Sequence, residues 1–325
     1  MITKGPFVSE MGDGDRVRSV LLVSDRRLLT ARNGKPYAKF RFMDRTGEIG
    51  GILWEDAHET LDGLEVGMIV GVRGVIESFN NVLQLKVEKV VRLEESEVDT
   101  ALLRPTSRLD LGTMTTELDE LIASIKNVHL KQMLDQIFGR EGLKQAFLKA
   151  PAAKGIHHSY IGGLLEHSLY IMKSIDALCP VYAHMGLSRD LLLSCAVLHD
   201  LGKVFEYTCE NVVEMTAVGR LIGHVYLSAH IADEEIGRIE GFPEDLRLHV
   251  VHTLLAHHGE LEFGSPKLPM TKEALFLHML DDLDAKLAGF AAIIEATPDE
   301  DEFSAYASAY GRHLYARGIH QEDEA

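Results

Sequence analysis

The sequence has few cysteines and no long apolar segment. Its three cysteines, Cys179, Cys195 and Cys209, form no C-x-x-C pair, which excludes a disulfide framework and a thiolate metal site. No stretch approaches the ~18 consecutive apolar residues of a membrane-spanning helix, and the amino-terminal residues lack the apolar core of a signal peptide. We therefore expect a cytoplasmic protein without a membrane partner.

The chain also lacks an overall excess of positive charge. It has 33 Lys and Arg against 50 Asp and Glu, a net charge of -17, which by itself argues against a polyanionic partner. Residues 16–45 reverse this sign, with nine basic residues against two acidic ones and a net charge of +7. This asymmetry suggests a local anion-binding face on an acidic body. The alternative is a set of solvated strand faces.

The length and composition indicate a folded protein of two domains. A chain of 325 residues exceeds what one hydrophobic core usually serves, and 46% hydrophobic residues is a globular composition. Residues 1–95 contain short segments with strand periodicity and one short helical segment. The expected strands span 17–29, 37–42, 49–54, 68–79 and 82–93, and the expected helix spans 57–64. Five strands with a helix between the third and the fourth predict an OB-fold β-barrel.

Aromatic and basic residues interleave in one of these strands. Tyr37, Phe40 and Phe42 alternate with Lys39 and Arg41 inside the basic segment. OB-folds bind single strands by stacking bases on aromatic rings and tracking the backbone with basic groups. We predict that these five residues bind nucleic acid, although strand alternation points Tyr37 away from Phe40 and Phe42, so some rings must belong to the core.

The rest of the chain reads as helical. Residues 96–112 have the polar composition of a linker, and 113–325 show helical periodicity and end in an acidic tail. The predicted fold is therefore an N-terminal five-stranded OB-fold β-barrel (1–95), a linker (96–112) and an all-α domain (113–325).

Histidines are concentrated in the helical part. Of sixteen histidines, twelve lie between 157 and 278. Several stand beside acidic or small residues, in the pairs and clusters Glu166-His167, His199-Asp200, Gly223-His224, His257-His258-Gly259 and Asp281-Asp282. Imidazole and carboxylate suit Mn, Fe, Co, Ni or Zn. A single histidine is more often structural, but five such settings together predict a metal site.

The order His167, His199-Asp200, Asp281 is the signature of the HD-domain metal-dependent phosphohydrolases, an all-helical superfamily, and His224 with His257-His258 resembles its dinuclear subset. The segments 157–169, 198–207, 219–225, 257–269 and 277–286, behind an OB-fold, closely resemble the YhaM-type 3′ to 5′ exoribonucleases. This resemblance covers nearly the whole chain. It implies hydrolysis of single-stranded RNA, and of some single-stranded DNA, with manganese as the favoured ion over Co²⁺, Fe²⁺, Ni²⁺ or Zn²⁺.

The resemblance also assigns metal ligands. It implies two ions per chain, and it divides seven residues between them. His167, His199, Asp200 and Asp281 would hold one ion, and His224, His257 and His258 would hold the second, with Asp200 bridging. Two cations about 3.5 to 4 Å apart can stabilise both the attacking and the leaving oxygen of a phosphodiester.

Two cations are candidates for catalysis. Lys203 lies four residues after His199, on the same face if the helix continues, so we expect it to contact the scissile phosphate. Arg220, four residues before His224, is expected to act similarly. The alternative for both is a solvated or ion-paired side chain.

Four further residues are expected near the substrate or the metal ligands. His157 and His158 are expected to touch the substrate or the surroundings of a ligand, and Asp284 to orient a ligand by a hydrogen bond. Ser265, in a Gly-Ser-Pro turn, is expected to line the cleft, although turn chemistry alone also explains it.

The sequence is compatible with three functions. The first is a metal-dependent 3′ to 5′ exoribonuclease, which requires both the barrel and the metal site. The second is an HD phosphohydrolase of nucleotides or cyclic nucleotides, for which a basic aromatic barrel has no obvious use. The third is a non-catalytic nucleic-acid-binding factor, which the filled set of ligand positions disfavours. The sequence predicts no oligomeric state.

Overall fold

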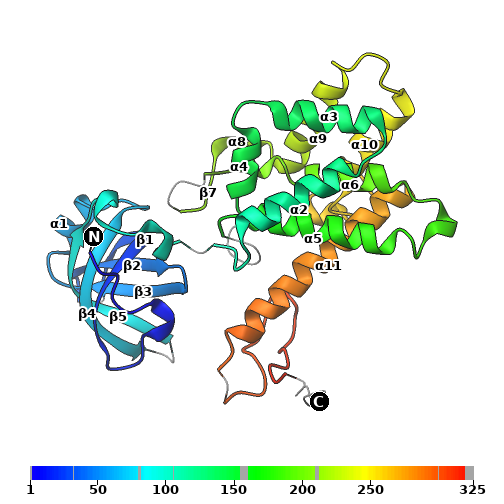
Figure 1. Cartoon of the computed structure of the whole chain (residues 1–325). Helices are drawn as coiled ribbons and strands as arrows, with labels where there is room; N and C mark the ends of the chain where they lie inside the picture. Colours follow the sequence, from blue (N-terminus) through cyan, green and yellow to red (C-terminus); the bar gives the residue numbers. More distant parts are fainter. Residues whose placement is uncertain are drawn as a thin grey trace. The chain divides into compact units, whose positions relative to one another are not determined.

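A computed structural model shows two compact units (Figure 1). It describes residues 2–31, 33–79, 82–104, 106–153, 160–208, 212–298 and 300–318. The first unit comprises Met1–Arg108 and Thr208–Glu214, and the second comprises Leu109–Tyr207 and Met215–Ala325. Each unit encloses a hydrophobic core of its own.

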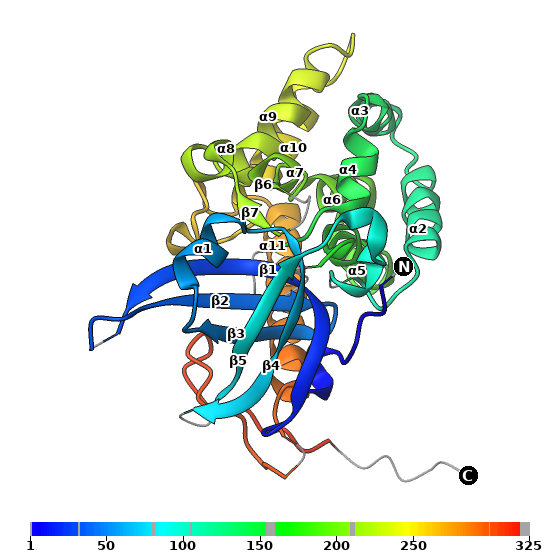
Figure 2. The ribbon, with the colours of Figure 1, turned by 90° about the vertical axis from the view of Figure 1, so that its left-hand side faces the viewer.

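The first unit is a closed five-stranded barrel. Its strands are β1 (Arg16–Thr30), β2 (Pro36–Asp44), β3 (Gly47–Leu53), β4 (Ile69–Phe79) and β5 (Val82–Arg92), with α1 (Ala57–Asp62) between β3 and β4. The order around the barrel is β1-β2-β3-β5-β4, and the parallel pair β3–β5 closes it (Figure 2). The long strand β1 pairs with both β2 and β4, and its register with β2 shifts between Val23 and Asp25. The predicted OB-fold is confirmed.

Strand alternation decides which side chains fill the barrel. On β2 the rings of Phe40 and Phe42 are buried and stacked 5.1 Å apart. A Cβ atom on Gly51 of β3 would lie 2.5 Å from the Phe42 ring, so the glycine makes room for it. The prediction that Phe40 and Phe42 bind nucleic acid is therefore wrong, because both rings are enclosed in the core and offer no face to a base.

The segment after β5 packs on the barrel. It contains two short 3-10 helices, η2 (Glu95–Glu97) and η3 (Thr100–Leu102). Val98 and Leu103 are buried in a cluster with residues of β1 and β4. The first unit therefore extends beyond residue 95, where we placed the start of the linker, as far as Arg108.

The second unit is a helical bundle. Its helices are α2 (Leu111–Ala123), α3 (Val128–Gly139), α4 (Leu143–Lys149), α5 (Gly163–Leu178), α6 (Arg189–Leu198), α7 (Lys203–Glu206), α8 (Ala217–Leu221), α9 (His224–Ile236), α10 (Glu244–Ala256) and α11 (Lys272–Glu295). The two-residue strands β6 (Tyr207–Thr208) and β7 (Glu214–Met215) pair with each other. No helix in the described part of the chain is long and apolar enough to cross a membrane.

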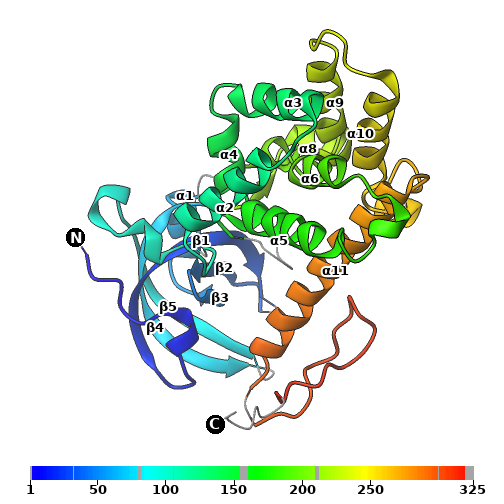
Figure 3. The ribbon, with the colours of Figure 1, turned by 45° about the vertical axis from the view of Figure 1, so that its right-hand side comes forward.

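Helices α5 and α6 form the centre of the bundle. They pack against each other and against α11, as Figure 3 shows. Every residue of α6 from Leu191 to Leu198 is buried, which is the pattern of a helix enclosed on all sides. Ser188 caps its amino terminus by accepting a hydrogen bond from the backbone N–H of Leu191. The rigid end of this helix then positions the residues that follow it.

Candidate metal centre

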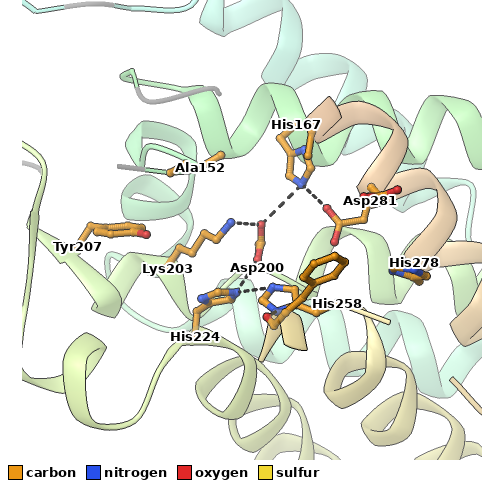
Figure 4. A pocket seen from close by; sticks show the side chains of 13 residues that line it. Ala152, His167, Asp200, Lys203, Tyr207, His224, His258, His278 and Asp281 are labelled. Atoms are coloured by element: carbon orange, nitrogen blue, oxygen red, sulfur yellow. Dashed lines mark hydrogen bonds and ion pairs between the residues drawn. The ribbon is translucent and has the colours of Figure 1, made fainter. Parts of the chain in front are cut away.

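Seven histidine and aspartate side chains form two adjacent groups of potential metal ligands. Figure 4 labels His167, Asp200, His224, His258 and Asp281 among them. One group comes from α5, the end of α6 and α11, and the other from the end of α6, the start of α9 and the end of α10. The groups are His167, His199 and Asp281, and Asp200, His224, His257 and His258. Within each group the ligand atoms all lie within 4.8 Å of one another. The structure therefore brings together every residue that the sequence motifs suggested as a ligand.

Asp200 faces both groups. Its Oδ2 atom lies 3.3 Å from Nε2 of His199 and 3.6 Å from Nε2 of His167. Its Oδ1 atom lies 3.3 Å from Nε2 of His224 and 3.7 Å from Nε2 of His257. The carboxylate thus turns one oxygen toward each group, which is the orientation that a bridging ligand requires.

Backbone carbonyl oxygens orient three of the histidine rings. The Nδ1 atoms of these rings lie 2.7–2.8 Å from carbonyl oxygens, in the pairs His199–Ala196, His257–Leu254 and His258–Phe263. Because a carbonyl oxygen only accepts hydrogen bonds, each Nδ1 must carry the proton and donate. In the neutral ring the Nε2 lone pair then points into the site, which is the form that binds metal.

Carboxylates orient two further rings. Nδ1 of His167 lies 2.6 Å from Oδ2 of Asp284 on α11, so Asp284 occupies the place we predicted for a ligand-orienting carboxylate. Nδ1 of His224 lies 2.5 Å from Oε2 of Glu206, which is buried on α7. Such carboxylate–histidine pairs fix the ring and raise its basicity toward a metal. Glu206 lies in segment 198–207 but was not predicted as a site residue, because it stands 18 positions from His224 and the sequence does not reveal their contact.

The ring geometry fits divalent cations. Nε2 of His167 lies 3.2 Å from Nε2 of His199, and the Nε2 atoms of His224 and His258 are also 3.2 Å apart. With the Nδ1 protons committed to hydrogen bonds, each pair needs a proton or a cation between its two Nε2 atoms, because two facing lone pairs repel each other. A set of imidazole nitrogens and carboxylate oxygens without thiolate suits Mn, Fe, Co, Ni or Zn.

The two groups differ in their affinity for protons. Burial lowers the pKa of His167, but hydrogen bonds to Asp281 and Asp284 outweigh it and raise the pKa to about 10. Burial and the neighbouring His257 lower the pKa of His258 to about 4, and burial also lowers the pKa of His257. Without metal, the first group therefore holds a proton near neutral pH, while His257 and His258 are already in the ligand form.

A glycine lets the two groups approach each other. Helix α6 ends at Leu198, and a turn through Gly202 leads into α7. A Cβ atom on Gly202 would lie 2.4 Å from the carbonyl oxygen of His224. The backbone N–H of Gly202 also donates to Oγ of Ser228 on α9 at 2.8 Å. The absence of a side chain at this position thus allows the start of α9 to pack directly against the turn that carries Asp200.

The two candidate catalytic cations occupy different environments. Lys203 is 9% exposed, and its Nζ atom lies 2.6 Å from Oδ2 of Asp200. Burial lowers its pKa, but Asp200 outweighs this effect and raises it, so the side chain is charged. Arg220 is exposed on α8 and does not line the cavity of the site. Lys203 reaches its place from a turn and the short helix α7, because the helix bearing His199 does not continue.

Three predicted site residues remain, and only Ser265 lies among the described residues. Ser265 is buried, and its hydroxyl lies 3.1 Å from the carbonyl oxygen of Leu255 and 2.6 Å from that of Lys267. The expectation that Ser265 lines the cleft is therefore corrected: its hydroxyl holds a turn, and the residue does not line the cavity. His157 and His158 lie outside the described residues.

A cavity of about 370 Å³ opens onto both ligand groups. In Figure 4, Lys203 and Tyr207 lie on one side of Asp200, and Asp281 and His278 lie on the other. Phe263 also lines this cavity. No role was predicted for Tyr207, Phe263 or His278, because their side chains are not metal ligands of the motifs in which they stand.

The outer face of the barrel carries the second candidate site. Tyr37 and Trp54 contact each other with ring centroids 4.8 Å apart, and Trp54 is 48% exposed. Lys39 and Arg41 are exposed on the same face of β2 as Tyr37. In the register of the two strands, Arg27 of β1 lies opposite Lys39. Trp54 follows directly after β3 and was not predicted from the sequence as a binding residue.

Two family models match the chain. Residues 20–93 match a model described as OB-fold nucleic acid binding domain, and residues 164–286 match the HD domain. Together with the paired ligand groups, these matches define the protein as a hydrolytic enzyme that couples a nucleic-acid-binding barrel to an HD domain.

The relatives identify its family. The chain is 32% identical to the 3′-5′ exoribonuclease YhaM of Geobacillus sp. (strain WCH70) over 281 residues, which cover 84% of this chain and 83% of that protein. The chain belongs to the YhaM family.

Two solved structures are similar to part of the chain. The second OB-fold domain of replication protein A from Methanococcus maripaludis is 19% identical, with 27% of this chain and 93% of that chain covered and a TM-score of 0.23. The HD domain of the L. monocytogenes phosphodiesterase PgpH is 20% identical, with 48% and 80% covered and a TM-score of 0.27.

Proposed function

We propose that this protein is a metal-dependent 3′ to 5′ exoribonuclease that hydrolyses phosphodiester bonds of single-stranded RNA and also accepts single-stranded DNA. The observation that carries the proposal is the orientation of Asp200, whose two oxygens face two separate histidine groups. Membership of the YhaM family supports the substrate and the direction of digestion.

The donor set supports two divalent cations per chain, with manganese favoured. His167, His199 and Asp281 would hold one, and His224, His257 and His258 the other, with Asp200 shared. Cations bound there would supply Lewis acidity toward the phosphate oxygens and lower the pKa of a bound water. Glu206 and Asp284 keep the rings of His224 and His167 in the orientation that ligation needs.

Lys203 is the side chain best placed to bind the substrate phosphate. Its ammonium group has three N–H donors, and Asp200 Oδ2 accepts from it at 2.6 Å. Lys203 also lines the cavity, so a phosphate oxygen entering there can accept a further hydrogen bond. The charge would stabilise the negative charge that develops as the phosphodiester bond breaks.

The barrel supports binding of single strands. Tyr37 and Trp54 present a pair of rings on which bases can stack, and the exposed side chains of Lys39 and Arg41 can neutralise phosphates. This combination favours an exonuclease over an HD enzyme that acts on free nucleotides, because a mononucleotide gains nothing from an extended basic face.

The decisive experiment uses single-stranded RNA labelled at either end, incubated with Mn²⁺ and the purified protein. With the 5′ label, a 3′ to 5′ exonuclease produces a ladder that shortens one nucleotide at a time. With the 3′ label, it releases the labelled mononucleotide at once. The opposite pattern would reverse the direction of digestion, and an intact RNA bound by the protein would favour the non-catalytic alternative.

Metal analysis tests the second ion. The His257→Ala variant should retain about one of two bound ions and should lose rate far more than RNA affinity. A variant that kept both ions and its full rate would remove the second ion from this proposal.

A further inference from the structure

One exposed aromatic ring at the metal centre has no evident role in the fold. Phe263 lies in the 3-10 helix η5 (Leu261–Phe263), which follows the ligand His258, and the residue is 59% exposed. It nevertheless lines the cavity that contains Asp200 and Lys203. Within the described residues no aromatic ring contact involves Phe263, and it belongs to none of the hydrophobic clusters. Its ring therefore contributes little to the stability of the bundle.

The backbone of Phe263 is held firmly even though its ring is exposed. Its carbonyl oxygen accepts the hydrogen bond from Nδ1 of His258 at 2.8 Å, and its N–H donates to the carbonyl oxygen of Glu260 at 3.1 Å. Ser265, two residues further on, anchors the same loop. The backbone that carries the ring is therefore held beside a metal ligand.

Gly259, at the start of the same loop, packs closely against a residue of α11. Gly259 has a φ of +76°, and a Cβ atom there would lie 2.2 Å from the ring of His278 on α11. His278 in turn is hydrogen-bonded through Nδ1 to the carbonyl oxygen of His257 at 3.0 Å. The loop that carries Phe263 is thus held between α10 and α11, so its backbone does not have to be ordered when a ligand stacks on the ring.

We propose that the ring of Phe263 is the stacking surface for the base of the terminal nucleotide, the one whose phosphodiester bond is cut. This inference rests on the proposed function and deepens it. Stacking tolerates every base because each has a π-face, so the enzyme would hold the strand end beside the ligand groups without reading its sequence. A cavity of about 370 Å³ lies within the size range of small-ligand sites, ~300–1,000 Å³.

The test compares RNA that ends in a normal 3′ nucleotide with RNA that ends in a stable abasic ribose analogue. The wild type should remove the abasic residue more slowly by roughly 5- to 150-fold, the scale of one base stacked on an aromatic side chain. Phe263→Ala should be slow on both substrates and should discriminate between them less than about 2-fold. Phe263→Trp should restore the discrimination, since the indole ring also stacks.

A matched control lies in the same loop. Leu261 is 62% exposed on η5 and does not line the cavity, so Leu261→Ala should keep the wild-type discrimination. None of these substitutions removes the backbone carbonyl that holds His258. Bound metal per chain should therefore be equal in the wild type, Phe263→Ala and Leu261→Ala. Equal discrimination by the wild type and Phe263→Ala, or an equal loss in both alanine variants, would overturn the proposal.

A binding measurement separates this inference from the proposed function. RNA ending in 2-aminopurine should lose fluorescence on binding to the chelator-treated wild type, because stacking quenches the base, and should stay bright with Phe263→Ala. Quenching without any hydrolysis in Mn²⁺ would leave the stacking site in place and refute the exoribonuclease. Hydrolysis with equal quenching in the two proteins would keep the exoribonuclease and refute the stacking site.

Discussion

The Nε2 atom of His257 and the Oδ1 atom of Asp200 face each other at 3.7 Å, and in the described part of the chain neither atom has a hydrogen-bond partner. Both atoms are buried, and a buried polar atom left unpaired costs about 1–3 kcal/mol. A divalent cation bound beside them would satisfy both atoms. The apparent stability of the protein should therefore depend on divalent metal.

Substitutions at Asp200 and Lys203 distinguish an effect on folding from an effect on catalysis. Asp200→Ala should abolish hydrolysis, and it should also destabilise the protein by about 3–5 kcal/mol, because it leaves the buried Lys203 ammonium without its partner. Adding Lys203→Met to this variant should recover much of the stability without restoring hydrolysis. Urea unfolding and RNA digestion of the two single variants and the double variant measure both effects. Recovery of hydrolysis in the double variant would show that Asp200 acts only through the fold.

The orienting carboxylates should affect the two groups separately. Glu206→Gln should weaken metal binding at the group that contains His224, and Asp284→Asn should weaken it at the group that contains His167. The loss of such a partner typically costs 10- to 100-fold in metal affinity or activity. Titration of the metal-free proteins with Mn²⁺ should show one weakened step in each variant, and the double variant should show two. Unchanged affinity in both single variants would exclude this orienting role.

The stability of the metal-free protein should fall at alkaline pH. The pKa of His167 is raised to about 10 in the folded chain, above its ordinary value of 6.5. The stabilisation from its protonated form is therefore complete below about pH 6.5 and is lost as the pH rises through about 10. Denaturant unfolding of the chelator-treated protein between pH 6.5 and 10 measures this loss.

The control for the alkaline decline is His167→Gln, which has no titratable ring at that position. It should be less stable than the wild type at pH 6.5, and the difference should shrink as the pH rises. Parallel curves for the two proteins would contradict the prediction.

Binding of RNA by the barrel should depend on its outer face. Replacing Lys39 and Arg41 with Gln should weaken single-strand binding and flatten its dependence on salt by roughly 0.7 in log K per log salt for each phosphate that is no longer neutralised. Trp54→Ala should weaken binding by about 1–3 kcal/mol, because a base can no longer stack on the indole ring. Fluorescence anisotropy at several salt concentrations checks both effects. Hydrolysis of the small ester bis-p-nitrophenyl phosphate should remain at the wild-type rate.

A core substitution provides the contrast for the barrel. Phe40 is 1% exposed, and Phe40→Ala should destabilise the barrel by about 3–5 kcal/mol. Its effect on RNA binding should follow from unfolding and vanish under conditions where the barrel stays folded.

The sequence predicted the ligands better than their surroundings. His167, His199, Asp200 and Asp281 stand in recognisable motifs, and Asp284 was found because it follows Asp281 by three positions on a helix. Glu206 was missed because its contact with His224 depends on a turn at Gly202 that brings two short helices together. Periodicity likewise separated Tyr37 from Phe40 and Phe42, but it does not tell which side of a strand faces the core. That choice depends on how the barrel closes.

The pocket leaves no room for a side chain at Gly202. Any side chain at this position would meet the carbonyl oxygen of His224 at 2.4 Å and push the start of α9 away from Asp200. His167, His199 and Asp281 belong to other helices and would keep their places. If the protein binds two ions as proposed, a single methyl group at Gly202 would therefore weaken the group that contains His224 and leave the other group intact.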